Sequence, residues 1–336
     1  MNLKEKLIEI TRPYFDEQTD YFTLTNATKA YYSLLEELSE KNLNTVQGRS
    51  NLGFDNGVAL GTNWAAMCIN DMLRTKQFIR GIDKAIVEKK KKKKKINFLY
   101  AGTGPYAALL LPIILRQNDC EINYTFLEIN PLSLELLNKT LEKLELNNKN
   151  ITALKEDAST YIIKSTNHPD IIVSETMQNA LAKEQQVSIF INLMSQVSKK
   201  TIFIPEKINL YIGLKKPNKQ NEINSTNFKI IDEVFSVSKS SKYFQKLLNQ
   251  KLKTLSFPVK KTFIKKEEID NNNMMVLLTD IVVFNDVKIS FNESGLTTPL
   301  YIQPLEPEKI REIEIETEYK IYKNPRLDYK IKINHI

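Results

Sequence analysis

The chain has 336 residues, of which 42% are hydrophobic and 26% charged, and its formal net charge is +8 at pH 7. This composition supplies enough apolar material for about two folded domains and excludes an intrinsically disordered chain. Seven consecutive lysines at 89–95 account for nearly all of the charge excess. Such a run is typical of a solvated connector, so nucleic-acid binding is not expected from the charge.

Cysteine usage and apolar runs narrow the class further. Cys68 and Cys120 lie far apart, so neither a disulfide framework nor a metal site is predicted. The N-terminus is charged from Lys4 and does not resemble a signal peptide. The longest apolar run, residues 107–115, is about half a membrane span. We therefore expect a cytoplasmic protein with no membrane segment.

Residues 1–88 are predicted to form an N-terminal helical region. Apolar side chains recur at helical spacing over residues 31–38 and again over residues 64–86. The segment between them, GRSNLGFDNGVALG, is rich in turn residues. Arg74 lies in the second helical segment, from which its side chain could meet an anion or form a surface ion pair.

Residues 89–205 are predicted to form a Rossmann-like α/β domain, because short apolar strands alternate with helices. The expected strands are 96–100, 124–127, 151–154, 171–173 and 201–204. The first strand leads into a G-x-G-x-x-A loop with Gly102 and Gly104, whose backbone N–H groups would face a ligand. The second strand ends in Glu128, placed to bind ribose hydroxyls. The third ends in Glu156-Asp157-Ala158.

A pair of glutamates follows the fourth strand. Glu175 lies just after the carboxyl end of this strand, and Glu184 lies nine residues later, where the next helix is expected to begin. Two carboxylates facing each other across a pocket would suit a planar cation such as a guanidinium. Taken singly, Glu175 would be a solvated loop residue and Glu184 would complement the helix dipole.

Residues 206–336 are predicted to form an antiparallel β-barrel-like domain for substrate binding or dimerisation. Apolar residues alternate with polar ones in several segments of this domain, which is typical of a sheet with one buried face and one solvent-exposed face. Residues 215–260 are rich in Lys, Ser and Asn and are interpreted as an insertion.

Together these features resemble the protein arginine N-methyltransferase family, a branch of the class I S-adenosylmethionine-dependent methyltransferases. Ser174-Glu175-Thr176-Met177 with Glu184 is similar to that family's S-E-x-M loop and its second glutamate. Asp71-Met-Leu-Arg74-Thr75 is similar to its D-x-x-R-T helix. The resemblance implies a Rossmann-like class I methyltransferase domain and the cofactor S-adenosylmethionine. It also implies a homodimer, with residues 215–260 as the candidate dimerisation arm.

The resemblance further implies a role for each site residue. Arg74, Gly102 and Gly104 would bind the methionyl carboxylate, Glu128 the ribose, and Asp157 with Ala158 the adenine. Glu175 and Glu184 would be the catalytic carboxylates, and Met177 would join them at the acceptor.

The acceptor stays open because one family feature is missing. The threonine-histidine-tryptophan loop is absent: the only histidines are His168 and His335, and residues 296–300 occupy the corresponding region. The missing loop, together with an N-terminal helical region of residues 1–88 that could cap the pocket, slightly favours a small guanidino or amino metabolite such as free arginine over an arginine-containing peptide. Alternatives are an NAD-dependent oxidoreductase, because the glycine loop with a downstream acid also fits that class, an RNA methyltransferase, or a non-catalytic binding protein.

Overall fold

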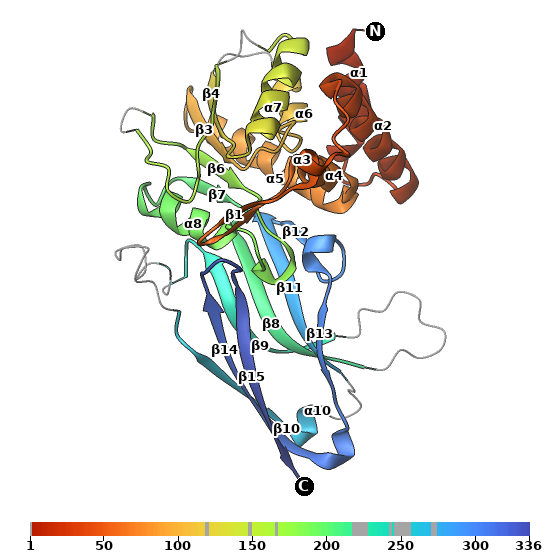
Figure 1. Cartoon of the computed structure of the whole chain (residues 1–336), viewed down its shortest axis with the longest axis vertical. Helices are drawn as coiled ribbons and strands as arrows, with labels where there is room; N and C mark the ends of the chain where they lie inside the picture. Colours follow the sequence, from red (N-terminus) through yellow and green to blue (C-terminus); the bar gives the residue numbers. More distant parts are fainter. Residues whose placement is uncertain are drawn as a thin grey trace.

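The computed structural model describes residues 2–117, 121–146, 150–164, 167–216, 228–241, 244, 257–269 and 274–336. Its N-terminal helices and an α/β layer lie at one end of an elongated molecule, and a β domain extends to the other (Figure 1). The two termini lie at opposite ends. Within the described ranges, no helix combines the length and apolar character that a bilayer crossing requires.

The N-terminal region is helical, with one hairpin that the sequence analysis did not predict. The predicted helix over 64–86 is divided in two, because the Asp71 side chain accepts a hydrogen bond from the Arg74 backbone N–H at 3.2 Å and caps a new helix. The elements are α1 (Leu3–Thr11), η1 (Arg12–Tyr14), α2 (Tyr21–Ser39), α3 (Val46–Arg49), β1 (Leu52–Phe54), β2 (Gly57–Ala59), α4 (Thr62–Met67), η2 (Cys68–Asn70) and α5 (Met72–Lys90).

The lysine run is exposed over residues 91–95, as expected for a solvated connector, but it also makes defined contacts. Helix α5 continues to Lys90. In its last turn, the Lys89 ammonium donates to the Lys200 carbonyl at 2.6 Å, and beyond the helix the Lys93 ammonium lies 2.7 Å from the Asp170 carboxylate. The run therefore holds the end of α5 against the amino-terminal edge of the central sheet.

The central sheet has five parallel strands in the order β5-β4-β3-β6-β7. This arrangement confirms the predicted Rossmann-like fold. Every residue of β6 is buried, as expected for a β-branched strand covered on both faces. The carboxyl ends of all five strands meet at one edge, where open α/β sheets bind ligands. The elements are β3 (Ile96–Ala101), α6 (Leu111–Arg116), β4 (Ile122–Leu127), α7 (Pro131–Lys143), β5 (Ile151–Leu154), β6 (Ile171–Ser174), η4 (Asn179–Leu181), α8 (Gln186–Ser195) and β7 (Ile202–Ile204).

The C-terminal domain is antiparallel, as predicted, but its described strands form two sheets rather than one closed barrel. One sheet has the order β12-β11-β8-β9 with β13 beside β11, and the other has the order β10-β14-β15. Tyr319 stacks on Phe235 across the two sheets with ring centroids 4.4 Å apart. The elements are β8 (Lys207–Lys215), β9 (Phe228–Ser238), β10 (Lys260–Lys265), α10 (Lys266–Ile269), β11 (Met274–Phe284), β12 (Val287–Ile289), η6 (Gly295–Thr297), β13 (Leu300–Pro304), η7 (Pro307–Lys309), β14 (Ile310–Lys320) and β15 (Arg326–His335).

The predicted insertion over residues 215–260 is corrected in part. Strand β9 pairs with β8 from end to end, so residues 228–238 belong to the domain's own sheet. The prediction failed there because the first half of β9 mixes polar and apolar residues without alternation and none of them is buried, so the pattern expected of a strand is absent. Residues 217–227, 242–243 and 245–256 of the candidate arm lie outside the described residues.

Candidate active site

A cavity of about 200 Å³ lies at the carboxyl edge of the parallel sheet, beside the β domain. The structure brings all nine predicted site residues together in its lining: Arg74, Gly102, Gly104, Glu128, Asp157, Ala158, Glu175, Met177 and Glu184. They come from α5 and from the segments that follow β3, β4, β5 and β6. The strand order explains this convergence, because residues that follow different parallel strands meet at one edge.

The glycine loop after β3 forms one wall. Gly102 and Gly104 have φ angles of 73° and 61°, a region that residues with a Cβ atom disfavour. A side chain at Gly102 would collide with the methyl group of Thr176, in the loop after β6. Gly102 therefore lets the backbone approach the loop that carries Glu175, and Gly104 is required by its φ angle.

Glu128 lies under this loop and is 6% exposed. Its Oε2 accepts a hydrogen bond from the Gly104 backbone N–H at 2.8 Å, and its Oε1 accepts one from the Asn130 N–H at 2.8 Å. Burial raises the pKa of this carboxyl, while the backbone donors oppose the shift. Carboxylate oxygens can accept more than one hydrogen bond, so Glu128 can also accept from ligand hydroxyls.

Another part of the cavity is lined by Glu156, Asp157 and Ala158, which follow β5 in the chain. Asp157 accepts a hydrogen bond from the Ser159 backbone N–H at 2.8 Å, and the buried Ala158 carbonyl accepts one from the Asn192 amide at 2.9 Å. Ile129 and Ile189 line the cavity beside them. Apolar walls with a few fixed polar groups are typical of small-molecule sites.

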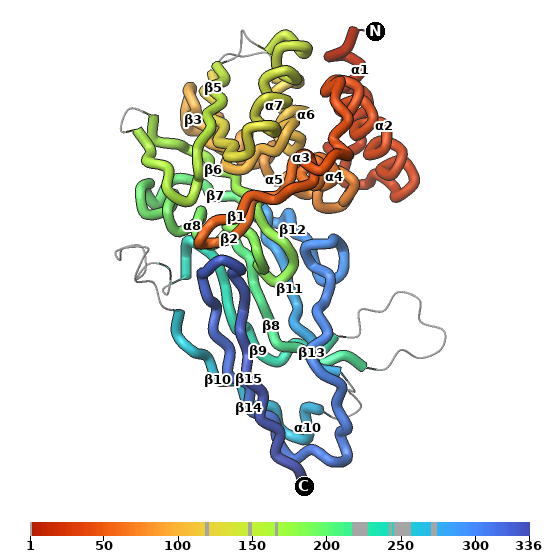
Figure 2. The backbone as a smooth tube through the Cα atoms, in the orientation of Figure 1, coloured from red at the N-terminus to blue at the C-terminus, as the bar shows by residue number. Residues whose placement is uncertain are grey.

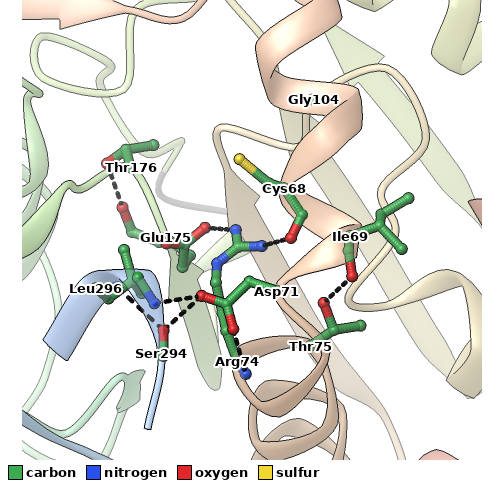
Figure 3. Close-up of polar contacts among 12 residues, drawn as sticks. Cys68, Ile69, Asp71, Arg74, Thr75, Gly104, Glu175, Thr176, Ser294 and Leu296 are labelled. Carbon is green, nitrogen blue, oxygen red and sulfur yellow. Dashed lines mark hydrogen bonds and ion pairs between the residues drawn. The ribbon is translucent and has the colours of Figure 1, made fainter. Parts of the chain in front are cut away.

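Arg74 and Glu175 form a buried ion pair at the centre of the site (Figure 3). Their side chains are 9% and 5% exposed. The Arg74 guanidinium bonds the Glu175 carboxylate through Nη2 and donates to the Cys68 carbonyl through Nη1 at 2.9 Å. Its remaining N–H donors can serve an incoming anion.

Glu184 lies in the same cavity and is 6% exposed. Burial raises its pKa to about 7, although the positive charge of Arg74 and a hydrogen bond with Gln178 act in the opposite direction. In the described part of the chain, no basic side chain forms an ion pair with it. Glu175 is thus ion-paired with Arg74, whereas Glu184 has no ion-pair partner among the described residues and could bind a cationic ligand.

The charge of the cavity as a whole favours a cationic ligand. Arg74 is the one basic side chain among its lining residues, whereas six carboxylates line it: Asp71, Glu128, Glu156, Asp157, Glu175 and Glu184. Carboxylates in a cleft with low-dielectric walls create a negative potential that attracts cations.

Glu184 should make stability depend on pH. Its pKa of about 7 in the folded protein lies above the ordinary value of 4.5, so the folded state retains a proton that the unfolded state has lost between these values. The stabilisation is complete below pH 4.5 and is lost as pH rises through 7. Relative to Glu184→Gln, the wild type should therefore lose roughly 3 kcal/mol of unfolding free energy across this range. Urea unfolding at a series of pH values measures the difference, and a constant difference would contradict the assignment.

Two further parts of the lining were not among the predicted site residues. Val58, Ala59 and Leu60 come from the β1–β2 hairpin and the residue after it. Within the described ranges, no residue before Val58 lines the cavity, so helices α1 and α2 do not cap it. The turn sequence Asp55-Asn56-Gly57 between short apolar segments is a hairpin signal that could have revealed this element.

The second part is η6, from the β domain, and its Leu296 begins the segment 296–300 that the sequence analysis places in the region of the missing family loop. Gly295 and Leu296 line the cavity. Asp71 accepts hydrogen bonds from the Ser294 hydroxyl at 2.6 Å and from the Gly295 backbone N–H at 2.8 Å, which joins the start of α5 to the β domain (Figure 3). These contacts span more than two hundred residues of sequence, and no local pattern indicates them.

The architecture is a Rossmann-like α/β domain joined to an antiparallel β domain. A solved structure with this fold is described as the Trypanosoma brucei PRMT1 enzyme-prozyme heterotetrameric complex with AdoHcy. The match has a TM-score of 0.51 and 12% identity, and it covers 80% of this chain and 94% of that chain. At this identity the likeness concerns the fold. No protein-family profile matches the sequence, and a search of curated proteins finds no significant match.

Proposed function

We propose that the protein is an S-adenosylmethionine-dependent methyltransferase that acts on a guanidino nitrogen. The observation that carries this proposal is the pair of buried glutamates, Glu175 and Glu184, in one cavity with a glycine loop and an ion-paired arginine. The fold shared with a PRMT1 structure that contains AdoHcy supports the choice of cofactor.

The residues present fit this cofactor. Arg74 would bind its carboxylate, the backbone at Gly102 and Gly104 would approach the methionyl part, Glu128 would accept from the ribose hydroxyls, and Asp157 with Ala158 would border the adenine. S-adenosylmethionine supplies a methyl group that its sulfonium already activates. The protein therefore needs chiefly to bind and orient the acceptor beside that methyl group.

Glu175 and Glu184 would hold the acceptor guanidinium through charge-assisted hydrogen bonds. This arrangement aims one nitrogen at the methyl group and draws positive charge toward the other nitrogens. A guanidinium nitrogen must lose one proton when it gains a methyl cation. Glu184, whose pKa is about 7, is suited to accept that proton near neutral pH.

We propose a small guanidino compound, with free arginine as the first candidate, as the acceptor. The support is the hairpin: its backbone packs directly against residues 183–185, so one side of the Glu184 site is covered by the chain itself. The second candidate is an arginine-containing peptide, which the shared fold with PRMT1 favours.

The deciding experiment combines binding and turnover. Isothermal titration should show binding of S-adenosylhomocysteine and no comparable binding of NAD. Methyl transfer from labelled S-adenosylmethionine should then be measured with free arginine, other small guanidino compounds and an arginine-rich peptide in parallel. Binding of NAD in place of the methyl donor would overturn the proposal. Transfer to the peptide alone would keep the reaction and replace the first acceptor with the second.

A further inference from the structure

The segment that precedes Glu184 has a strained backbone. Ala180, Leu181 and Lys183 have φ angles of 55°, 55° and 65°, in the left-handed region that non-glycine residues disfavour. Such residues persist only where the surrounding structure holds them, and they concentrate at functional sites. The contacts that hold this segment therefore decide where the Glu184 carboxylate points.

The β domain holds one side of the segment. The buried Tyr319 hydroxyl donates to the Leu181 carbonyl at 2.7 Å, and the Lys183 N–H donates to the Pro325 carbonyl at 2.7 Å. The Ala180 N–H donates to the Thr279 hydroxyl at 3.2 Å. These hydrogen bonds tie residues 180–183 to the β domain, and none of them involves Glu184.

The β1–β2 hairpin holds the other side, where it crosses between the parallel sheet and the β domain (Figure 2). The Val58 N–H donates to the Lys183 carbonyl at 2.9 Å, and Val58 forms an isolated β-bridge with Glu184. Asn56 accepts from the Gln185 amide at 2.7 Å and donates to the Ser159 hydroxyl at 3.0 Å. The hairpin thus contacts Glu184 and both of its neighbours in the chain.

Gly57 makes this close approach possible. Its φ angle is 136°, and a Cβ there would lie 3.0 Å from the Lys183 carbonyl oxygen and 3.1 Å from the Glu184 carbonyl carbon. Contacts of that length with backbone atoms force one of the two segments to move. Gly53, its counterpart in the other hairpin strand, is exposed and has no atom within 4 Å of its Cβ position. Only one of the two glycines is therefore required by packing.

We propose that Asn56 and Gly57 are positioning residues for Glu184, and that the β1–β2 hairpin fixes the carboxylate in the acceptor site. The role of Glu184 itself rests on the function proposed above. The hairpin is also tied to the opposite end of the cavity, because the Leu60 carbonyl accepts from the Asn130 amide at 3.3 Å. Asn130 in turn donates its backbone N–H to Glu128. The segment after the hairpin is thereby fixed at the proposed ribose end as well.

The first test compares Gly57→Ala with Gly53→Ala in the full-length chain. Gly57→Ala should lower kcat by about tenfold to a hundredfold, because small displacements of reacting groups have effects of this size. Its Kd for S-adenosylhomocysteine and its KM for the methyl donor should stay within about twofold, since positioning the acceptor is separable from binding the cofactor. Gly53→Ala should match the wild type. Equal kcat values for the two variants would overturn the proposal.

A second variant guards against misfolding of Gly57→Ala. Asn56→Ala keeps the glycine and removes only the side-chain bonds to Gln185 and Ser159. It should lower kcat in the same direction, by about threefold to tenfold, with the same unchanged cofactor Kd. A loss of cofactor binding equal to the loss of kcat would indicate a merely structural role and would also overturn the proposal.

An NMR titration of the Glu184 side-chain carbon separates this inference from the proposed function. The titratable groups that line the same cavity are Cys68, Asp71, Arg74, Tyr100, Glu128, Glu156, Asp157 and Glu175. The hairpin adds Asp55, which is exposed, the adjacent segment adds Lys183, and β14 adds Tyr319. Gly57→Ala and Asn56→Ala should weaken the contact between the hairpin and residues 183–185. Water would then reach Glu184 and lower its pKa from about 7. A lowered pKa in a protein without methyl-transfer activity would refute the proposed function and retain the hairpin's role, whereas an unchanged pKa in Gly57→Ala would refute that role.

Discussion

Replacing Glu184 with glutamine is expected to leave the fold and cofactor binding intact and to lower turnover by about a hundredfold or more. The loss follows from the acceptor side, because removing one charge of a desolvated pair costs roughly 3 to 5 kcal/mol. The fold should persist because glutamine resembles the protonated carboxyl that burial already favours at this position. Steady-state kinetics with S-adenosylmethionine and the acceptor measure the change, and calorimetry measures cofactor binding.

Replacing Glu175 with glutamine should give the same loss of turnover but a different stability. Glu175 is the ion-pair partner of Arg74, so its removal leaves a guanidinium that is only 9% exposed without a counter-ion. We expect a loss of roughly 3 to 5 kcal/mol in unfolding free energy, by analogy with other broken buried pairs. Glu233→Gln is a suitable control, because its pair with Lys207 is about two-fifths exposed on both sides. Wild-type turnover in either cavity variant would contradict the proposed role of the glutamate pair.

The parallel sheet could be predicted from sequence because its signals are local. Short apolar runs bounded by turn residues predicted the third strand over its full extent, residues 151–154, and placed the first and fourth strands within one residue. Strand β9 lacks such a signal, since its sequence FKIIDEVFSVS mixes exposed polar and apolar residues in the first half. Its assignment depends on pairing with β8, which is a tertiary contact.

The site likewise has features that local sequence signals predict and features that depend on tertiary contacts. Gly102, Glu128 and Glu175 each follow a predicted strand, so the fold alone carries them to one edge of the sheet. The pairing of Arg74 with Glu175 joins residues 101 positions apart, and the hairpin reaches Glu184 from even farther along the chain. Periodicity and motif spacing report nothing about contacts of that kind. The structure was therefore needed to show which of the two glutamates is already paired.

Replacing Arg74 with methionine should abolish measurable cofactor binding and destabilise the fold. The guanidinium is the cavity's one basic group, and without it a cofactor carboxylate would meet only acidic side chains and backbone N–H groups. We expect the Kd for S-adenosylhomocysteine to rise by about a hundredfold or more, as for other hydrogen-bonded buried charge pairs. Arg80→Met is the matched control on the same helix, because the Arg80 side chain is 10% exposed and also ion-paired, but its partner Glu17 is 72% exposed and Arg80 does not line the cavity. The Kd of this control for S-adenosylhomocysteine should equal that of the wild type.

The double variant Arg74→Met with Glu175→Gln separates the two roles of the arginine. Each single variant leaves one buried charge without its partner, whereas the double variant leaves none, so its stability should exceed that of either single variant. Cofactor binding should not recover, because that function requires the positive charge itself. Calorimetry measures the Kd for S-adenosylhomocysteine, and urea unfolding measures the stability, of the wild type, the two single variants and the double variant. If binding returned together with stability, Arg74 would be a structural residue whose loss merely disorders the cavity, and the proposed carboxylate site would have to lie elsewhere.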